Sequence, residues 1–339
     1  MSSTDTSAAA QELRKSLLND VSTSYGLMGL TWRAEPVTYD LAKYTLDEVL
    51  KTCPSSKVMF NVGEFYGNDG INLEYCYNYI SHLDANDRER VIVSCKGGVD
   101  LKTLIPDGRR EFVAKSIESC LHFLKYIDIF QVARVDMEHW RESFDTIVEY
   151  IKKGKIGGIS LSEVTLDQLK TINKEYGDYI CCAELEFSMY SRHILDDGTI
   201  AYCNEIGLPI VCYSPLGAGI LTGAITKNGD IPSGDFRKSL KMMSDNGLKQ
   251  NLQLVEYLKK NFYIEGKRSL PQIAISWILH YNKIFKKTNL IPLPGGTTPD
   301  KVRDNLTACV DLLSDAEFAQ INEFLKTFNR VGSRYEFAA

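Results

Sequence analysis

The stretch Arg-Val-Ile-Val-Ser-Cys at residues 90–95 is an almost unbroken apolar run, and Lys96, Gly97 and Gly98 follow it directly. An amphipathic stretch over 109–125 comes next. Strands that are apolar on both faces are expected when helices cover both sides of a parallel sheet. These residues therefore predict a β-strand followed by an α-helix, with Lys96 at the carboxyl end of the strand.

The same alternation continues in both directions along the chain. Other apolar runs lie near 25–30 and at 57–61, 128–133, 156–161, 179–184, 209–213 and 289–292. Other amphipathic stretches lie at 37–51, 72–83, 140–153, 166–175, 199–206, 248–281 and 299–309. Eight strand-then-helix units without a break in composition predict an α/β fold, a single (β/α)8 TIM barrel with long loops at its C-terminal face.

Helix caps refine this prediction. Thr298 before Pro299 is typical of an N-cap followed by proline at the first helical position. The capping box Ser-Asp-Ala-Glu at 314–317 predicts an extra helix at the C-terminus. The same spacing at 269–272 predicts that the longest amphipathic stretch breaks near Gly266.

One barrel domain is expected over 21–339, after an N-terminal extension, residues 1–20, that we expect to be disordered. An open doubly wound sheet is the alternative, because Gly217, Gly219 and Gly223 follow a strand. Their spacing departs from the GxGxxG of dinucleotide-binding folds, which favours the barrel.

Charge and cysteine content limit the function classes. The formal net charge is −5, with no block of like charge, which argues against a nucleic-acid surface. No apolar stretch is long enough for a membrane span. The nine cysteines lack metal-ligand spacing and predict buried, reduced thiols and no metal site. We expect a cytoplasmic protein, with nuclear access left open, and a monomer, with an oligomer left open.

Two side chains near strand ends suggest chemistry, because barrel enzymes gather their catalytic groups at the C-terminal ends of the strands. Lys96 ends one strand, and Tyr66 lies in the glycine-bracketed turn at 63–67. An ammonium beside a phenol lowers the pKa of the phenol from about 10. Tyr66 could then donate a proton to a carbonyl oxygen during reduction. The alternative interpretation is a packed tyrosine and a solvated lysine.

Four blocks, in order, resemble the aldo-keto reductase family across most of the chain. Residues 26–30 (GLMGL) resemble its glycine-rich first strand, and 61–67 (NVGEFYG) resemble its DTAxxYG block. Residues 213–223 (YSPLGAGILTG) match its YSPLGxGxLTG segment almost letter for letter. Residues 291–297 (IPLPGGT) resemble its phosphate loop. The resemblance implies a barrel that binds a nicotinamide cofactor.

The catalytic set of this family is Asp, Tyr, Lys and His, of which Tyr66 and Lys96 match. Asn61 stands at the aspartate position and Ala133 at the histidine position. The resemblance implies that Asn61 hydrogen-bonds Lys96 without neutralising it, so that Lys96 perturbs Tyr66 more strongly. It also implies that the donor that orients the substrate carbonyl is missing.

This altered pattern resembles the pyridoxal reductases of the family, in which NxGEFYG and ARVD blocks occur with GLMGLTWRP. The corresponding stretches here are 61–67, 133–136 and 26–33. The resemblance implies the reversible reduction of pyridoxal, a small aldehyde, to pyridoxine, with hydride from C4 of the nicotinamide and a proton from Tyr66. Substrate contacts are expected from Trp32, Phe65, Ala133, Arg134 and Trp140.

NADPH is the cofactor that the resemblance implies. Its nicotinamide would contact Ser162, Glu163, Glu184 and Tyr213, with Tyr213 stacked on the ring. Its pyrophosphate would meet the backbone of Ser214, Leu216 and Gly219, and further contacts are expected from Gly29, Leu30 and Thr31. Its adenosine 2′-phosphate would face Gly296, Thr297 and Lys301, with Asp304 and Asn305 near the adenine. A lysine at 301 binds phosphate as a point charge, which favours NADPH over NADH.

Two other functions remain open. A reductase for another small aldehyde would carry the same motifs. A catalytically weak, cofactor-bound regulatory subunit of the potassium-channel β-subunit type is favoured by Asn61 and Ala133. The matching Tyr66 and Lys96 favour the enzyme.

Overall fold

Short parallel strands form the centre of the molecule. The structure is a computed structural model that describes residues 7–307, 313–333 and 336–337. Its strands pair in chain order and are β1 (Val21–Gly26), β2 (Lys57–Gly63), β3 (Val91–Gly97), β4 (Ile127–Val132), β5 (Ile156–Ser162), β6 (Ile180–Glu186), β7 (Ile210–Tyr213) and β8 (Leu290–Leu293).

Strands β1 and β8 meet where the sheet closes on itself. Ser24 Oγ donates to the carbonyl oxygen of Pro292 at 2.8 Å, and the Gly26 N–H donates to that of Pro294 at 3.0 Å. A parallel bridge between Gly26 and Gly295 continues the pairing. The predicted (β/α)8 barrel is therefore confirmed, and the open doubly wound sheet is wrong.

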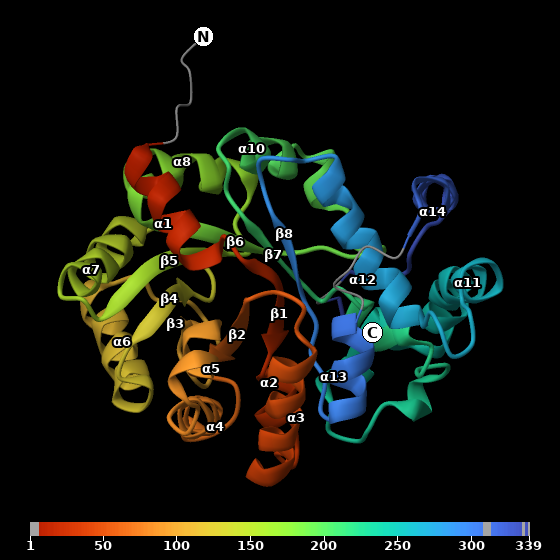
Figure 1. Cartoon of the computed structure of the whole chain (residues 1–339), viewed down its shortest axis with the longest axis horizontal. Helices are drawn as coiled ribbons and strands as arrows, with labels where there is room; N and C mark the ends of the chain where they lie inside the picture. Colours follow the sequence, from red (N-terminus) through yellow and green to blue (C-terminus); the bar gives the residue numbers. More distant parts are fainter. Residues whose placement is uncertain (1–6, 308–312, 334–335, 338–339) are drawn as a thin grey trace.

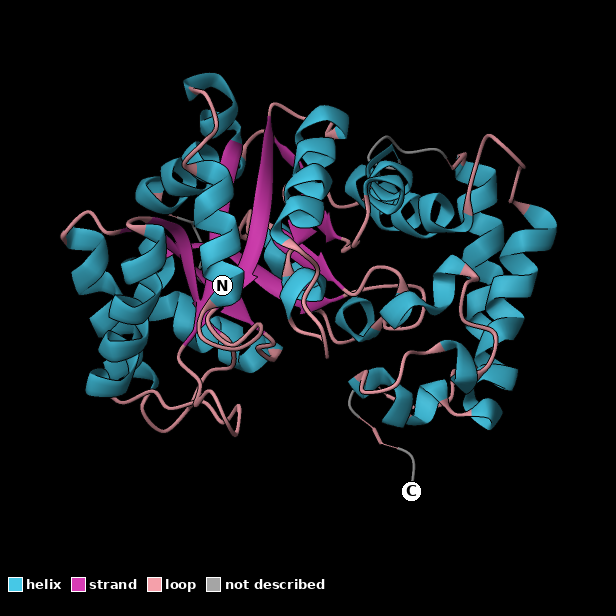
Figure 2. Cartoon of the chain, turned by 90° about the horizontal axis from the view of Figure 1, so that it is seen from below, coloured by secondary structure: helices cyan, strands magenta, loops and turns pink. Residues whose placement is uncertain are grey.

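Helices surround the strands and connect them in sequence (Figures 1 and 2). They are α1 (Ala8–Leu18), α2 (Met28–Thr31), α3 (Tyr39–Thr52), α4 (Ile71–Ile80), α5 (Ala85–Arg90), α6 (Arg110–Leu124), α7 (Trp140–Lys152), α8 (Leu166–Tyr176), α9 (His193–Asp196), α10 (Thr199–Glu205), α11 (Asp245–Asn261), α12 (Leu270–His280), α13 (Pro299–Leu306) and α14 (Asp315–Thr327). Figure 1 shows α11, α12 and α14 on the same side of the molecule.

Apolar side chains form a large core between strands and helices and a smaller cluster inside the barrel. The inner cluster includes Met59 on β2, Ile129 on β4 and Cys182 on β6. Side chains alternate along a strand, so residues two positions further on also face inward. They lie nearer the C-terminal ends of the strands, where the candidate site is expected.

Helix α1 packs against this inner cluster. Its apolar contacts to the cluster come from Leu13, Leu17 and Leu18. Arg14 donates to the carbonyl oxygens of Ile180 at 3.1 Å and Ile206 at 2.6 Å. The expectation of disorder over 1–20 is therefore wrong for this helix, because its leucines bury apolar surface that the barrel offers. Residues 1–6 lie outside the described residues.

The first strand lies earlier than expected. β1 spans Val21–Gly26 instead of 25–30, and Met28–Thr31 forms the short helix α2. Its sequence, VSTSYG, lacks the apolar run of the other strands. Hydroxyl side chains replace that run, and two of them have partners: Ser24 Oγ donates to the carbonyl oxygen of Pro292 at 2.8 Å, and Thr23 Oγ1 lies 3.5 Å from the same oxygen. Ser22 Oγ is buried without a hydrogen-bond partner among the described residues.

The expected helix caps are confirmed. Thr298, Ser269 and Ser314 each accept a hydrogen bond from the backbone N–H three residues further on. The expected break in the longest amphipathic stretch is confirmed too, because α11 ends before α12 begins. Of the helix expected over 299–309, α13 covers the part up to Leu306, and residues 308–312 lie outside the described residues.

The eight cysteines within the described residues are buried and free, as expected, and Cys309 lies outside that part of the chain. Burial raises the pKa of the Cys203 thiol to about 12. Over the described ranges, no group of three His, Cys, Asp or Glu side chains could hold a metal ion. Within the same ranges, no helix has the length and apolar character needed to cross a membrane.

Candidate active site

A layer of polar side chains lies above the apolar cluster inside the barrel. Asn61 on β2, Gln131 on β4 and Glu184 on β6 each follow an apolar member of the inner cluster by two residues. Side chains from alternate strands form such layers in (β/α)8 barrels. All three residues are buried, and Lys96 of β3 joins them. Polar groups removed from water need partners, so these four side chains have to pair with one another.

Tyr66 and Lys96 lie in direct contact. Lys96 Nζ donates to the Tyr66 hydroxyl oxygen at 2.8 Å. The turn that carries Tyr66 is tight, since a Cβ on Gly63 would lie 2.9 Å from the phenol ring and Gly67 has a φ of +108°. Thr31 Oγ1 donates to the carbonyl oxygen of Tyr66 at 2.6 Å and holds the turn against α2. The structure thus brings together the two residues that the sequence singled out.

Glu184 forms an ion pair with Lys96. Its Oε1 contacts Lys96 Nζ, and the residue is only 1% exposed. Burial disfavours the ammonium form, but the charge of Glu184 and the hydrogen bonds to Glu184 and Tyr66 outweigh burial and raise the pKa of Lys96 above its usual value. Lys96 therefore stays protonated at neutral pH.

The amides of Asn61 and Gln131 complete the surroundings of Glu184. Asn61 Nδ2 donates to Glu184 Oε2 at 2.6 Å, and Gln131 Nε2 donates to the same oxygen at 3.0 Å. Ionised carboxylates only accept hydrogen bonds, so the amide nitrogens must face Glu184.

Two expectations change as a result, and a third stays untested. The expected hydrogen bond between Lys96 and Asn61 is wrong, because Lys96 donates to Tyr66 and pairs with Glu184, and the Asn61 amide nitrogen donates to Glu184. The expectation that Lys96 stays unneutralised is wrong, because Glu184 supplies the negative charge. The nicotinamide contact expected for Glu184 stays a prediction, and in the structure both of its carboxylate oxygens are engaged inside the barrel.

Sequence reasoning missed Gln131 and Asn72. Gln131 Nε2 also lies 3.2 Å from Ser94 Oγ. Asn72 accepts from the Gly63 N–H at 3.1 Å and donates to Thr31 Oγ1 at 2.7 Å, so it braces both sides of the tyrosine turn. Gln131 could have been noticed as a polar residue within an apolar strand. Whether its side chain faces the inside of the barrel becomes clear only once the strand bounds are known.

Aromatic side chains flank Tyr66. Trp32 stacks on the Tyr66 ring at a centroid distance of 5.6 Å, and Phe65 meets it edge-on at 4.9 Å. Trp32 is 41% exposed and can contact a ligand. Trp140, expected at the same aromatic wall, is instead 6% exposed and packs against aromatic rings of α7 and α8. Its expected substrate contact is therefore wrong.

Ala133 and Arg134 follow the end of β4. The Ala133 N–H donates to the carbonyl oxygen of Gly97 at 2.9 Å, which extends the strand pairing. Its methyl group offers no hydrogen bond to a substrate. Arg134 Nε donates to Glu163 Oε2 at 3.2 Å, so two of the predicted site residues hold each other.

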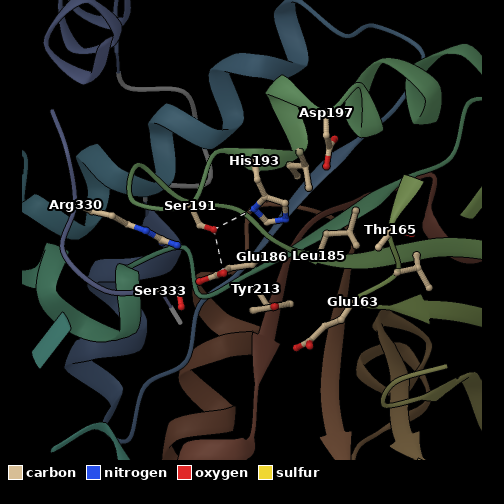
Figure 3. A pocket seen from close by; sticks show the side chains of 12 residues that line it. Glu163, Thr165, Leu185, Glu186, Ser191, His193, Asp197, Tyr213, Arg330 and Ser333 are labelled. Carbon is tan, nitrogen blue, oxygen red and sulfur yellow. Dashed lines mark hydrogen bonds between the residues drawn. The ribbon is translucent and has the colours of Figure 1, made fainter. Parts of the chain in front are cut away.

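A cavity opens beside the ends of β5, β6 and β7 (Figure 3). Tyr213, at the end of β7, lines it together with Glu163 and His193. Ser191 Oγ donates to Glu186 Oε2 at 3.0 Å and lies 3.3 Å from His193 Nδ1. Sequence reasoning did not select these last three residues. Tyr213 thus borders a cavity into which a planar ring could enter and stack on its side chain.

The loop after β7 has the shape expected of a phosphate-binding segment. Gly217 has a φ of +57°, and a Cβ there would lie 2.4 Å from the Tyr190 ring, so only glycine fits. A Cβ on Gly219 would lie 3.2 Å from Arg237 Nη1. Arg237 Nη1 donates to the Ala218 carbonyl oxygen at 3.0 Å. A loop with small side chains suits the close approach of an anionic pyrophosphate, and the guanidinium beside it is also paired with Asp235 at 2.6 Å.

A second predicted cofactor segment follows β8. Lys301 Nζ lies 3.5 Å from Thr297 Oγ1, and Thr297 Cγ2 lies 3.7 Å from where a Cβ on Gly29 would be. Asn305 Nδ2 donates to the Gly295 carbonyl oxygen at 3.0 Å and secures the loop. Gly29, Thr297 and Lys301 are therefore neighbours, and Lys301 supplies a positive charge.

Other predicted cofactor residues have structural partners. Leu30 is fully buried, and the Thr31 hydroxyl is hydrogen-bonded within the tyrosine turn. Asp304 Oδ1 accepts from Ser269 Oγ at 2.6 Å, at the start of α12. The carbonyl oxygen of Gly296 accepts from a tyrosine hydroxyl of β1 at 2.5 Å. Of the remaining predicted residues, Ser162 is the last residue of β5, and Ser214 and Leu216 follow the end of β7.

Comparison with known proteins agrees with this geometry. The Aldo/keto reductase family model matches residues 23–326. The chain belongs to this family. This aldo-keto reductase is therefore an oxidoreductase, with its polar cluster at the position where barrel enzymes place their active sites.

Relatives and solved structures cover nearly the whole aldo-keto reductase chain. The "Putative pyridoxal reductase" of Saccharomyces cerevisiae is 43% identical, over 96% of this chain and 98% of its own length. The "Probable pyridoxal reductase 2" of Schizosaccharomyces pombe is 31% identical, over 91% of this chain and 93% of its own. A glycerol dehydrogenase from Gluconobacter oxydans superposes with a TM-score of 0.74 over 94% of this chain and 95% of its own, at 18% identity. That last likeness supports the barrel fold alone.

Proposed function

We propose that this aldo-keto reductase reduces the aldehyde of pyridoxal to the alcohol of pyridoxine with NADPH, reversibly, and that Tyr66 donates the proton. The observation that carries the proposal is the 2.8 Å contact between Lys96 Nζ and the Tyr66 hydroxyl. A phenol held by an ammonium near the barrel mouth is suited to general acid catalysis at a carbonyl oxygen. The names of two relatives, 43% and 31% identical, support pyridoxal as the substrate.

The residues of the chain handle the proton. NADPH, when bound, supplies a hydride to the aldehyde carbon. Tyr66 transfers its phenolic proton to the aldehyde oxygen, so the tyrosine O–H bond breaks and the O–H bond of the alcohol forms. The hydride would bring the electron pair of the cofactor C–H bond to the aldehyde carbon, where a C–H bond replaces the carbonyl π bond and NADP⁺ is left. Lys96 stabilises the resulting phenolate, and solvent returns the proton. In the reverse direction, the phenolate of Tyr66 removes the proton of the alcohol.

The residues present fit NADPH. The glycine-bearing loop after β7, with Arg237 beside it, suits the pyrophosphate. Lys301 and Thr297 offer a positive charge and a hydroxyl to the 2′-phosphate. Tyr213 borders the cavity in which a nicotinamide could stack. Ser162, which we propose contacts the carboxamide, lies at the end of β5.

Aromatic side chains suit a planar substrate. Trp32 and Phe65 both contact the ring of Tyr66, and Trp32 is partly exposed. Flat rings favour offset or edge-on packing against other rings. A pyridine aldehyde could therefore lie against Trp32 with its carbonyl oxygen at the Tyr66 hydroxyl.

The test is the oxidation of NADPH in the presence of pyridoxal and a panel of other small aldehydes. We expect turnover that prefers pyridoxal, and a loss of about 10²–10⁴-fold in Tyr66→Phe, the usual contribution of a general acid. NADPH binding should be unchanged in this variant. A clear preference for another aldehyde would keep the reductase and overturn the pyridoxal assignment.

Ala133 leaves a second function open, because its side chain cannot donate to a carbonyl oxygen. A regulatory subunit of the potassium-channel β-subunit type would bind NADPH tightly and turn over every aldehyde negligibly. That combination of results would replace the reductase proposal.

A further inference from the structure

Glu184 is a buried carboxylate whose charge acts on a residue of another strand. It lies on β6, and Lys96, its ion-pair partner, lies on β3. Lys96 Nζ in turn donates to the Tyr66 hydroxyl at 2.8 Å. Lys96 thus lies between this carboxylate and Tyr66, the proposed proton donor.

The amides around Glu184 hold its carboxylate in one orientation. Asn61 donates to its Oε2 from β2 at 2.6 Å, and Gln131 donates to the same oxygen from β4 at 3.0 Å. Strands β2, β3, β4 and β6 therefore each contribute one member of a single network.

We propose that Glu184 is the positioning residue of the active site, holding the Lys96 ammonium against Tyr66 and offsetting its charge so that the phenol keeps its proton until a carbonyl arrives. This inference rests on the proposed function of Tyr66 and Lys96. The sequence offered no carboxylate as the partner of Lys96, because the uncharged Asn61 stands at the aspartate position of the family. The proposal gives this role to Glu184.

The charge balance explains why the carboxylate matters. An ammonium next to a phenol favours the phenolate, and phenolate cannot donate a proton. Other carboxylates near the barrel mouth have partners of their own, Glu163 with Arg134 and Glu186 with Ser191. Glu184 is the carboxylate that contacts Lys96, so it sets how strongly the lysine acts on Tyr66.

The first test is the pH profile of kcat for aldehyde reduction. Wild-type reduction should fall at high pH, as Tyr66 loses its proton. In Glu184→Gln this fall should move to lower pH by about one unit or more, since the ammonium is no longer balanced. The matched control is Glu317→Gln, which breaks an ion pair with Arg268 away from the barrel interior and should leave the midpoint unchanged. An unchanged midpoint in Glu184→Gln would overturn the proposal.

An exchange of amide and carboxylate tests the charge directly. Asn61 and Glu184 are hydrogen-bonded, so Asn61→Asp alone places two carboxylates side by side and should reduce kcat. Asn61→Asp combined with Glu184→Gln restores one carboxylate and one amide at the same contact. This double variant should recover the wild-type midpoint and at least about tenfold in kcat over the weaker single variant. A double variant no better than Glu184→Gln would contradict the proposal.

A titration without cofactor separates this inference from the proposed function. Tyrosinate absorbance of the wild type minus that of Tyr66→Phe isolates one phenol among the 18 tyrosines. The same difference measured in a Glu184→Gln background should titrate at lower pH. If the wild type reduces no aldehyde, the proposed function fails, and this titration still decides the role of Glu184. Identical titrations in both backgrounds would refute that role.

Discussion

Lys96 has two functions that place opposite demands on its charge. It must be positive to stabilise a phenolate on Tyr66, and it must be balanced to remain buried. Glu184 provides the balance, and the pKa of Lys96 is raised because this attraction outweighs burial. The pair is therefore both a stabilising contact and part of the proposed chemistry.

Replacing Lys96 by methionine should destabilise the fold as well as abolish turnover. The change leaves the carboxylate of Glu184 buried without its cation, which costs about 3–5 kcal/mol. Denaturant unfolding at neutral pH measures this loss. Lys96→Met combined with Glu184→Gln removes the unpaired charge and should regain much of the stability, but not the activity. Equal stabilities of the single and double variants would contradict this account.

The pH dependence of this stabilisation follows from the raised pKa of Lys96. The contribution is fully present below the unfolded-state pKa of about 10.4 and is lost as pH rises through the higher folded-state value. The stability difference between wild type and Lys96→Met should therefore stay constant from neutral pH to about pH 10. A decline near neutrality would show that another group controls the difference.

Lys301 should select NADPH over NADH. A charged hydrogen bond to phosphate contributes about 1.5–3 kcal/mol, so Lys301→Ala should weaken NADPH binding by about tenfold or more. NADH lacks the 2′-phosphate, and its affinity should not change. Quenching of tryptophan fluorescence can follow both titrations. Lys326→Ala, which removes a lysine on α14, is the control and should leave both affinities unchanged. An equal loss of affinity for NADPH and NADH would mean that Lys301 contacts a part of the cofactor other than the 2′-phosphate.

Two connecting elements position the proposed site. The turn after β2 carries Tyr66 and is held by Thr31 and Asn72. The loop after β7 places Gly217 against Tyr190. In both, a glycine accommodates a close contact that a larger residue would prevent.

Gly217→Ala should therefore impair cofactor binding. Its positive φ costs a β-carbon residue about 1–2 kcal/mol, and the new Cβ would also clash with Tyr190. Gly154→Ala is the matched control, because its φ is +67° but nothing lies within 4 Å of the added Cβ. Both variants should lose stability, whereas Gly217→Ala alone should lose NADPH affinity. Equal NADPH affinity in the two variants would argue against pyrophosphate binding at this loop.

Helix α1 lies outside the repeating strand–helix units and packs against the inner cluster of the barrel. Leu18 of this helix is 2% exposed and packs in the inner cluster, and Arg14 hydrogen-bonds backbone carbonyl groups of two distant segments. The N-terminal segment is therefore part of the fold and not an appendage.

Leu18→Ala should lower the free energy of unfolding by about 2–5 kcal/mol, the usual cost of truncating a buried leucine. The apolar cluster is separate from the polar layer, so KM values for NADPH and pyridoxal should change little. Lys15→Ala, on an exposed face of the same helix, is the control and should change stability by less than about 0.5 kcal/mol. A Leu18→Ala variant as stable as the control would mean that α1 is not needed to fill the barrel.

Local patterns were sufficient for most of the architecture. Apolar runs and helix caps predict the barrel, because each strand and helix leaves its periodicity in contiguous residues. The positions of Lys96 after an apolar run and of Tyr66 in a glycine turn mark them as a candidate pair, which the structure brings into contact. The bounds of the first strand and the presence of α1 could not be predicted in this way. Hydroxyl groups replace the apolar run in VSTSYG, and α1 packs against distant strands.

The pairing inside the barrel required the folded chain. Asn61, Lys96, Gln131 and Glu184 belong to four different strands, and no local pattern relates them. Closure of the sheet and inward alternation bring them together, so that the carboxylate missing at Asn61 is supplied by Glu184. The sequence around Trp140 likewise does not predict that this side chain is buried between helices. Sequence periodicity specifies which face of an element is buried, whereas contacts across the barrel depend on how all eight strands are arranged in space.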